Sequence, residues 1–402
     1  MRDVTRQPRG TVLGDTHNFG RHVSARGARI QKPRPVFWEW LFLSAKSPLR
    51  RVLDDAAVED GLGPNSFGFL PDLAFTSHPS LAGGAVERVS LAPLGRLGAH
   101  DRTELARIFG RALALFSWFG VTDLHWENLA LGRGPRGQIV FTPLDVEMIL
   151  DDFALPTSTK LLPESDADYA DTYRHAAGAR RVLPWLGKPL RGDDLAAIIA
   201  AYLATLDLLE RHRAGIAHVL AALPELTKTP IRVLLRATGD YVRARTEPVW
   251  PPLLDAEAEQ LARGDIPYFF RLYGAPGIRY YTRRDLTTTG RLPLRGDVPQ
   301  LAPLLDVARG LRRAQGRHLR EEGLFAILGA FDHPTLRGVF AASDLSLSLT
   351  ARKVTLSLPG GEVLEAHRKF GALVGSVYLP CRCGEVSTAL VPAVTRCTLD
   401  RR

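Results

Sequence analysis

The segment from residue 101 to residue 149 restricts the fold of this 402-residue chain more than any other. It begins with DRTELARIFGRALALFSWFG, which repeats apolar residues at helical spacing and opens with an aspartate that complements the helix dipole. The strings LALG and QIVFTPLDV then flank the glycine-containing turn GRGPRG, which predicts a hairpin of two short strands. A long helix must therefore lead directly into a polar loop and a tight hairpin.

Polar residues at defined spacing lie in that loop and after the hairpin. Asp123 and Asn128 are five residues apart, and Asp145 follows the second strand. Phosphoryl transfer needs a residue that orients the attacking hydroxyl, and amide and carboxylate oxygens that bind Mg²⁺. We expect Asp123 to orient the hydroxyl, and Asn128 and Asp145 to be the metal ligands. Each residue, taken singly, is also compatible with a structural role in a turn.

A lysine near the N-terminus completes this set. Residues 11–34 alternate as a strand, a polar turn with Gly14 and Gly20, and a second strand, so they predict a hairpin with a polar tip. Lys32 lies on the second strand, where its ammonium group would reach the phosphates of ATP; the alternative is a solvated strand lysine.

Protein kinases keep the same five-residue interval between the catalytic aspartate and the metal-binding asparagine. This sequence departs from kinases in other respects, because the motifs H-R-D and G-x-G-x-x-G are absent and D-V-E replaces D-F-G.

The chain divides into three predicted parts. Residues 1–95 read as a β-containing N-lobe, and residues 96–320 as a mainly helical C-lobe whose last long helical pattern spans 229–264. Residues 321–402 read as a small β-rich extension, in which LSLSLTARKVTLSLPGGEVLEA alternates around a PGG turn and predicts a hairpin. The predicted fold class is α+β, with a bilobal fold like that of protein or lipid kinases.

Composition places the chain among globular proteins. It is 45% hydrophobic and 24% charged, without a run of apolar residues long enough for a membrane span and without an apolar signal core, so we expect no transmembrane segment and a cytoplasmic location. The net charge of +9 comes from scattered arginines and gives no support to nucleic-acid binding. Cys381, Cys383 and Cys397 lack the spacing of a metal site and are interpreted as free thiols.

Several motifs in order resemble one enzyme family between about residue 11 and about residue 315. They are GDTHNFGRHV with IQKPRP, DLHWENLALG, PLDVE, IRVLLRATGDY and RGDIPYF. Together they resemble the dehydratase domain of class II lanthipeptide synthetases, the LanM family. The resemblance implies a kinase-like fold that uses ATP and Mg²⁺ to phosphorylate Ser and Thr in a ribosomal precursor peptide. Elimination of phosphate then gives dehydroalanine and dehydrobutyrine.

The resemblance also divides the candidate residues between the two reactions. It assigns phosphorylation to Lys32, Asp123, His125, Asn128, Asp145 and Glu147, and it assigns elimination to Asp15, His17, Arg232 and Thr238. An arginine suits bidentate phosphate binding and a threonine can donate a hydrogen bond, in agreement with this division. If RVLLRAT is wholly helical, however, Arg232 and Thr238 lie on different parts of the helix surface and do not converge.

The resemblance is incomplete at both ends, which leaves three functions open. Only a short segment precedes the GDTHN loop, and the tail lacks the Cys and His ligands of a zinc-dependent cyclase, so ring formation is not expected. The leading hypothesis is a dehydratase that acts on a precursor peptide with a separate cyclase or synthetase. The alternatives are a kinase that phosphorylates a peptide or small molecule without elimination, and a non-catalytic, pseudokinase-like partner of a synthetase.

Overall fold

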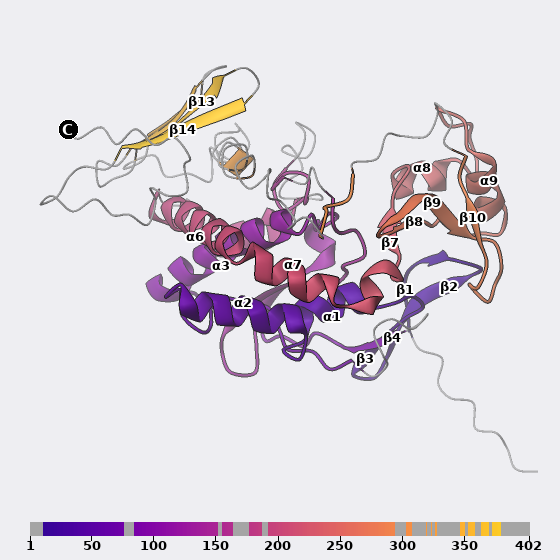
Figure 1. Ribbon diagram of the computed structural model, residues 1–402, viewed down its shortest axis with the longest axis horizontal. Coiled ribbons are helices and arrows are strands. Elements are labelled where there is room, and N and C mark those ends of the chain that lie inside the picture. The colour runs from indigo at the N-terminus through magenta and orange to yellow at the C-terminus, as the bar shows by residue number, and fades with distance from the viewer. Residues whose placement is uncertain are drawn as a thin grey trace, which may run out of the picture.

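The computed structural model describes residues 11–75, 84–151, 155–163, 177–186, 192–293 and 303–307, a few positions between 319 and 327, and four strands between 346 and 378 (Figure 1). Across these residues the chain combines helices with antiparallel sheets, so the α+β class is confirmed in this coarse form. None of the helices in the described ranges has a stretch long and apolar enough to cross a bilayer.

The first sheet holds the N-terminal strands in the order β1-β2-β3-β4. The strands are β1 (Thr11–His17), β2 (Arg21–Arg26), β3 (Arg29–Lys32) and β4 (Gly84–Glu87), and all neighbours are antiparallel. The predicted single hairpin over residues 11–34 is in fact two hairpins, because Gly27 makes a second turn with φ of 59°. Strand β1 also continues through Asp15 to His17, so the first turn is confined to residues 18–20.

Two helices lie between β3 and β4 in the chain. Helix α1 (Phe37–Leu43) ends where Ser44 adopts an extended backbone, and helix α2 (Pro48–Glu59) begins after Ser47, whose hydroxyl accepts a hydrogen bond from the Arg50 amide at 3.0 Å. Proline at the first helical position lacks an amide hydrogen and keeps the preceding residue out of the helical conformation. Pro48 therefore starts α2 and keeps Ser47 outside it, in the capping position.

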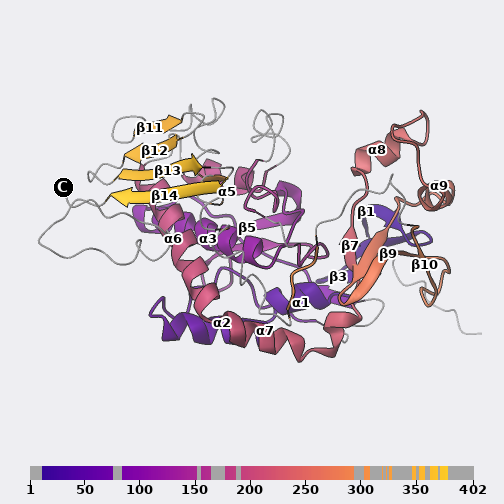
Figure 2. The same ribbon diagram turned by 45° about the horizontal axis from the view of Figure 1, so that its top comes forward.

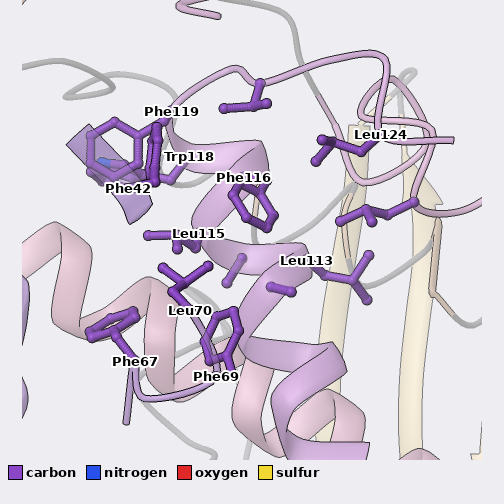
Figure 3. Close-up of a cluster of buried hydrophobic side chains, with 14 of the residues drawn as sticks. Phe42, Phe67, Phe69, Leu70, Leu113, Leu115, Phe116, Trp118, Phe119 and Leu124 are labelled. Carbon is purple, nitrogen blue, oxygen red and sulfur yellow. The ribbon is translucent and has the colours of Figure 1, made fainter. Parts of the chain in front are cut away.

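The main core forms around two long helices, α3 (Ala99–Trp118) and α6 (Gly192–Arg211). Their backbones approach closely at Gly110, where a Cβ atom would lie 2.1 Å from the Ile198 carbonyl oxygen. Figure 3 shows Phe42 of α1 against Phe116 and Phe119, with ring centroids 5.9 and 5.4 Å apart. Each such ring stabilises the fold by roughly 1.5–3 kcal/mol on burial. The core thus joins residues from both sides of position 95.

Helix α7 (Arg213–Ala221) and the shorter α5 (Ala179–Leu186) complete the helical layer. The predicted hairpin after α3 is confirmed. It consists of β5 (Leu129–Arg133) and β6 (Ile139–Pro143), antiparallel in register from Leu129 opposite Pro143 to Arg133 opposite Ile139. Its turn contains Gly137 at φ of 78°, a backbone conformation that favours glycine.

The helix expected over residues 229–264 is not formed, and its first part is instead strand β7 of a second sheet. Its strands, in the order β10-β9-β8-β7, are β7 (Ile231–Val233), β8 (Phe269–Leu272), β9 (Ala275–Tyr281) and β10 (Thr289–Arg291). Only α8 (Thr238–Arg243) and α9 (Asp255–Ala262) are helical there. The prediction of one long helix is wrong because the branched residues Ile231 and Val233 bury their side chains by pairing with β8, a partner distant in sequence.

The four-stranded sheet near the C-terminus includes the predicted hairpin. Strands β12 (Lys353–Ser357) and β13 (Val363–Lys369) are antiparallel, flanked by β11 (Ser346–Leu349) and β14 (Ala372–Tyr378). Figures 1 and 2 place this sheet near α6, far from β7–β10. The three cysteines lie outside the described residues.

Candidate active site

One cavity of about 850 Å³ brings together residues from the first sheet, the loop after α3, the segment after β6, and β7. A cavity of this size is sufficient for a nucleotide and part of a second substrate. All ten residues selected from the sequence line it: Asp15, His17, Lys32, Asp123, His125, Asn128, Asp145, Glu147, Arg232 and Thr238. Positions separated by more than two hundred residues in the chain therefore share one site.

Lys32 is held at the end of β3 by three oxygen atoms. The residue is only 4% exposed, and its Nζ lies 2.9 Å from Glu39 Oε1, 2.8 Å from the Leu144 carbonyl oxygen and 3.4 Å from Asp145 Oδ1. Burial of an ammonium group is tolerated only when such partners replace water. The interpretation of Lys32 as a solvated strand residue is therefore wrong.

Glu39 was missed in the sequence, although a signal was present. It is the single carboxylate in the apolar helix FWEWLFL and is 1% exposed. A charged residue in such a helix is rarely buried without a specific partner. Its partners are Lys32 and Arg34, which belong to the strand and loop before the helix. A lysine on a strand paired with a glutamate on the following helix is also the arrangement that positions the phosphate-binding lysine in protein kinases.

Arg34 links the carboxylates of this region and was also missed. Its guanidinium contacts Glu39 and Asp145, and its Nε lies 3.0 Å from Glu147 Oε2 in an ion pair that lacks hydrogen-bond geometry. Burial acts to raise the pKa of Asp145, but the positive charges of Arg34 and Lys32 outweigh it and hold that pKa well below its usual range. Asp145 is therefore an ionised carboxylate at any pH at which the protein would function.

The loop after α3 is held in place before it reaches Asp123. Gly120, at φ of 59°, ends the helix beside Asp151, where a side chain would meet backbone atoms at 2.3 Å. The buried Leu124 then donates its amide to the Thr159 carbonyl oxygen at 2.9 Å. These contacts fix the backbone on both sides of Asp123. The φ angle of Asp123 is 66°, a left-handed conformation that costs a non-glycine residue roughly 1–2 kcal/mol.

Asp123 and Asn128 contact each other directly. The Asn128 amide Nδ2 donates to the Asp123 carbonyl oxygen at 2.9 Å and to Asp123 Oδ2 at 3.3 Å, and the Asn128 carbonyl oxygen accepts from the Leu144 amide at 2.7 Å. These contacts join the loop to the segment that carries Asp145. Burial raises the pKa of the Asp123 carboxyl, opposed by the nearby His125, Arg232 and Lys160 charges. A raised pKa makes this carboxylate a better proton acceptor.

The two other predicted members of the phosphorylation group differ in exposure. His125 is partly exposed, and its Nδ1 lies 4.0 Å from the carboxylate of the exposed Glu127. Glu147 is buried and forms an ion pair with Arg232, whose backbone amide also donates to the Glu147 carbonyl oxygen at 2.8 Å. Glu147 therefore joins the segment that carries Asp145 to β7.

Arg232 and Thr238 are not on a common helix. Arg232 lies on β7, and Thr238 is the first residue of α8, after an irregular segment. The chain changes direction between them, so both line the cavity, whereas a continuous helix would separate them. The guanidinium of Arg232 lies 5.4 Å from the ring centre of Tyr268, which also lines the cavity and had no role in the sequence-based assignment.

His17 enters the cavity from the end of β1, as does Asp15. Its Nδ1 lies 2.7 Å from the Ile266 carbonyl oxygen, which can only accept a hydrogen bond, so Nδ1 carries the proton. Burial, together with the positive charge of Arg232, lowers the pKa of His17. The imidazole is therefore neutral near pH 7, with the lone pair on Nε2.

No protein-family model matches the chain, and no curated protein shows significant similarity to it. The geometry of the cavity and the chemistry of its residues are therefore the basis for a functional proposal.

Proposed function

We propose that the chain is an ATP-dependent peptide Ser/Thr kinase and phosphate lyase, a lanthipeptide dehydratase with a kinase-like bilobal fold. One observation carries the proposal: a single cavity is lined both by a kinase-like set around Lys32, Asp123 and Asp145 and by a second set with His17 and Arg232. A kinase requires only the first set. A neutral histidine and an arginine beside it supply a base and a phosphate-binding cation.

In the first reaction, the hydroxyl oxygen of a peptide Ser or Thr attacks the γ-phosphorus of ATP. Asp123 accepts the hydroxyl proton, and the bond from the γ-phosphorus to the β–γ bridging oxygen breaks as ADP leaves. Lys32, positioned by Glu39, holds the phosphates. The raised pKa of Asp123 favours proton acceptance, and its fixed backbone directs the carboxylate.

The oxygen donors beside these groups suit Mg²⁺. Asp145 is an ionised carboxylate, and Asn128 commits its Nδ2 to Asp123, so its side-chain Oδ1 is the atom suited to a metal ion. Magnesium prefers such oxygen ligands together with substrate phosphates. When bound, the ion would neutralise the developing charge on the phosphates. Because Arg34 pairs with Asp145, metal binding also requires that ion pair to loosen.

In the second reaction, the phosphorylated residue loses its α-proton and its phosphate. Nε2 of His17 takes the proton, the electron pair forms the Cα–Cβ double bond, and the Cβ–O bond breaks. Arg232 and Thr238 bind the departing phosphate, for which Arg232 exchanges its contact with Glu147. Ser gives dehydroalanine and Thr gives dehydrobutyrine. A separate cyclase or synthetase would use these products.

The alternative is a kinase that releases a phosphorylated peptide or small molecule without elimination. The contact between Arg232 and Glu147 favours it, because the guanidinium is already paired and its side chain is only 13% exposed. Under this alternative Arg232 only connects β7 to the metal-binding segment. The wild-type protein would then accumulate a stable phosphorylated product.

The test uses a Ser- and Thr-containing precursor peptide encoded beside the gene for this chain, with ATP and Mg²⁺, followed by mass spectrometry. The proposal expects intermediates heavier by one phosphate and products lighter by one water. Asp145→Asn should abolish phosphorylation, whereas Arg232→Ala should accumulate phosphopeptide. Glu104→Gln, which alters an ion pair with Arg111 away from the cavity, serves as the control. If a verified substrate shows neither of these mass changes, the proposal is refuted.

A further inference from the structure

The turn between β1 and β2 has an unusual backbone. Asn18, Phe19 and Gly20 have φ angles of 50°, 70° and 77°, three successive residues in the left-handed region. Only the glycine adopts this conformation without strain, so the two preceding residues need support from outside the turn. The turn follows His17 directly and is therefore the connection that sets where β1 ends.

The support comes from Asp265, in the RGDIPYF motif, more than two hundred residues away. Its side chain is fully buried, with 0% exposure, and its two carboxylate oxygens accept the amide hydrogens of Phe19 at 2.7 Å and Gly20 at 2.8 Å. Successive amides in such a turn form a concave site for an anion. Here the protein fills that site with its own carboxylate.

Neighbouring residues of the same motif hold the end of β1. The Ile266 amide donates to the Thr16 carbonyl oxygen at 2.8 Å, and the Thr16 hydroxyl donates to the Gly264 carbonyl oxygen at 3.1 Å. The guanidinium of Arg263 lies 4.0 Å from the centre of the Phe19 ring. The turn is thus fixed by its backbone, its aromatic ring and the strand before it.

These contacts determine the state of His17. The Ile266 carbonyl oxygen that accepts from Nδ1 follows Asp265 in the chain, so we expect a displacement of Asp265 from the turn to separate the ring from its partner. We propose that Asp265 is a positioning residue that holds the β1–β2 turn and thereby fixes His17 with Nδ1 protonated and Nε2 directed to act as a base. The effect on elimination rests on the proposed function; the effect on His17 does not.

Asparagine is the most informative replacement for Asp265. It keeps the volume but offers one oxygen acceptor and an amide group, so one of the two turn amides would face another donor. Glutamate keeps both oxygens but is longer by one methylene group. We expect Asp265→Asn to release the turn and Asp265→Glu to displace it to a smaller extent.

The direct test is NMR of protein labelled with ¹⁵N-histidine, with the His17 signal assigned by its loss in His17→Gln. In the wild type we expect a proton on Nδ1 and a pKa below the ordinary value of histidine, because burial and the charge of Arg232 lower it more than the charges of Glu147 and Asp15 raise it. In Asp265→Asn the tautomer should become mixed, because Nδ1 loses the acceptor that holds its proton. Hydrogen exchange of a peptide covering residues 16–20 should accelerate at least about tenfold.

Glu257→Gln is the matched control. Glu257 is equally buried and binds the Leu254 amide, Arg236 and Tyr241, but it makes no contact with the turn. The Glu257→Gln variant should leave the tautomer and the pKa of His17 unchanged. If Asp265→Asn and Asp265→Glu both fold and leave His17 and the exchange of residues 16–20 as in the wild type, the proposal is overturned.

Product analysis then separates this inference from the proposed function. With the precursor peptide, ATP and Mg²⁺, Asp265→Asn should phosphorylate within about twofold of the wild-type rate but accumulate phosphopeptide, as loss of His17 would. An equal loss of phosphorylation and elimination would indicate that Asp265 has a merely structural role, and it would count against the proposal that Asp265 positions His17. A wild type without either reaction would refute the dehydratase proposal, while the His17 result would still decide the role of Asp265.

Discussion

The buried ion pair between Lys32 and Glu39 allows a quantitative prediction. Glu39 is 1% exposed and accepts from two cations, Lys32 at 2.9 Å and Arg34. Breaking a buried pair by removal of one partner costs about 3–5 kcal/mol, since the other charge is left without compensation. The amide side chain of a Glu39→Gln variant would keep one oxygen acceptor, so we expect the free energy of unfolding to fall by about 2–3 kcal/mol.

A double-mutant cycle distinguishes this explanation from a general packing defect. Lys32→Met removes the cation but keeps the length of the side chain. Because the double variant with Glu39→Gln leaves neither member of the pair charged, its loss of stability should be smaller than the sum of the single losses by at least about 1 kcal/mol. MgATP binding should weaken in all three variants, because each lacks a positioned lysine.

The assay is equilibrium urea unfolding followed by tryptophan fluorescence, with MgATP affinity measured by calorimetry. Glu104→Gln is the control, because Glu104 forms a 2.9 Å pair with Arg111 that is partly exposed, and such pairs contribute less than about 1 kcal/mol. Additive losses in the cycle, or a Glu39→Gln loss no larger than that of the control, would refute the role given to this pair.

Three further predictions address packing, pH and metal. Gly110→Ala should destabilise the protein by about 3 kcal/mol, since the new Cβ would lie 2.1 Å from the Ile198 carbonyl oxygen, whereas Gly215→Ala, with its nearest atom at 3.9 Å, should be neutral or stabilising in the same unfolding assay. The elimination rate, measured on phosphopeptide, should be constant above about pH 6.5 and fall as pH drops through the lowered pKa of His17, because only the neutral imidazole accepts a proton; a rate that rises toward acid would contradict this role. In calorimetric titrations, Asp145→Asn should remove the Mg²⁺ dependence of ATP binding, and unchanged dependence would exclude Asp145 as a ligand.

Local spacing was sufficient for the residues that lie close together in the chain. The helix before Asp123, the hairpin after Asn128 and the position of Asp145 follow from periodicity and turn chemistry over fewer than fifty residues, and the structure has each of these elements. Lys32 was selected because a strand lysine would supply the cation of this set, and it lines the same cavity as the other selected residues. The lengths of the N-terminal strands and helices were less predictable.

Residues that act through distant partners could not be found in this way. Arg34 and Asp265 look like ordinary surface charges in the sequence, and their importance lies in three carboxylates and two backbone amides brought to them by folding. The strand at Arg232 was misread as helix, because the apolar period of IRVLL fits both structures and pairing with β8 decides between them.

The sequence by itself determined the composition of the site: a lysine, aspartates, an asparagine, a histidine and an arginine in an order that fits phosphate chemistry. Only the tertiary structure decided how these groups are charged and directed. Burial and neighbouring charges keep Asp145 ionised and His17 neutral, and the RGDIPYF segment fixes the end of β1. The physical reason is that residue identity is local, whereas desolvation, ion pairing and backbone support depend on which distant segments pack together.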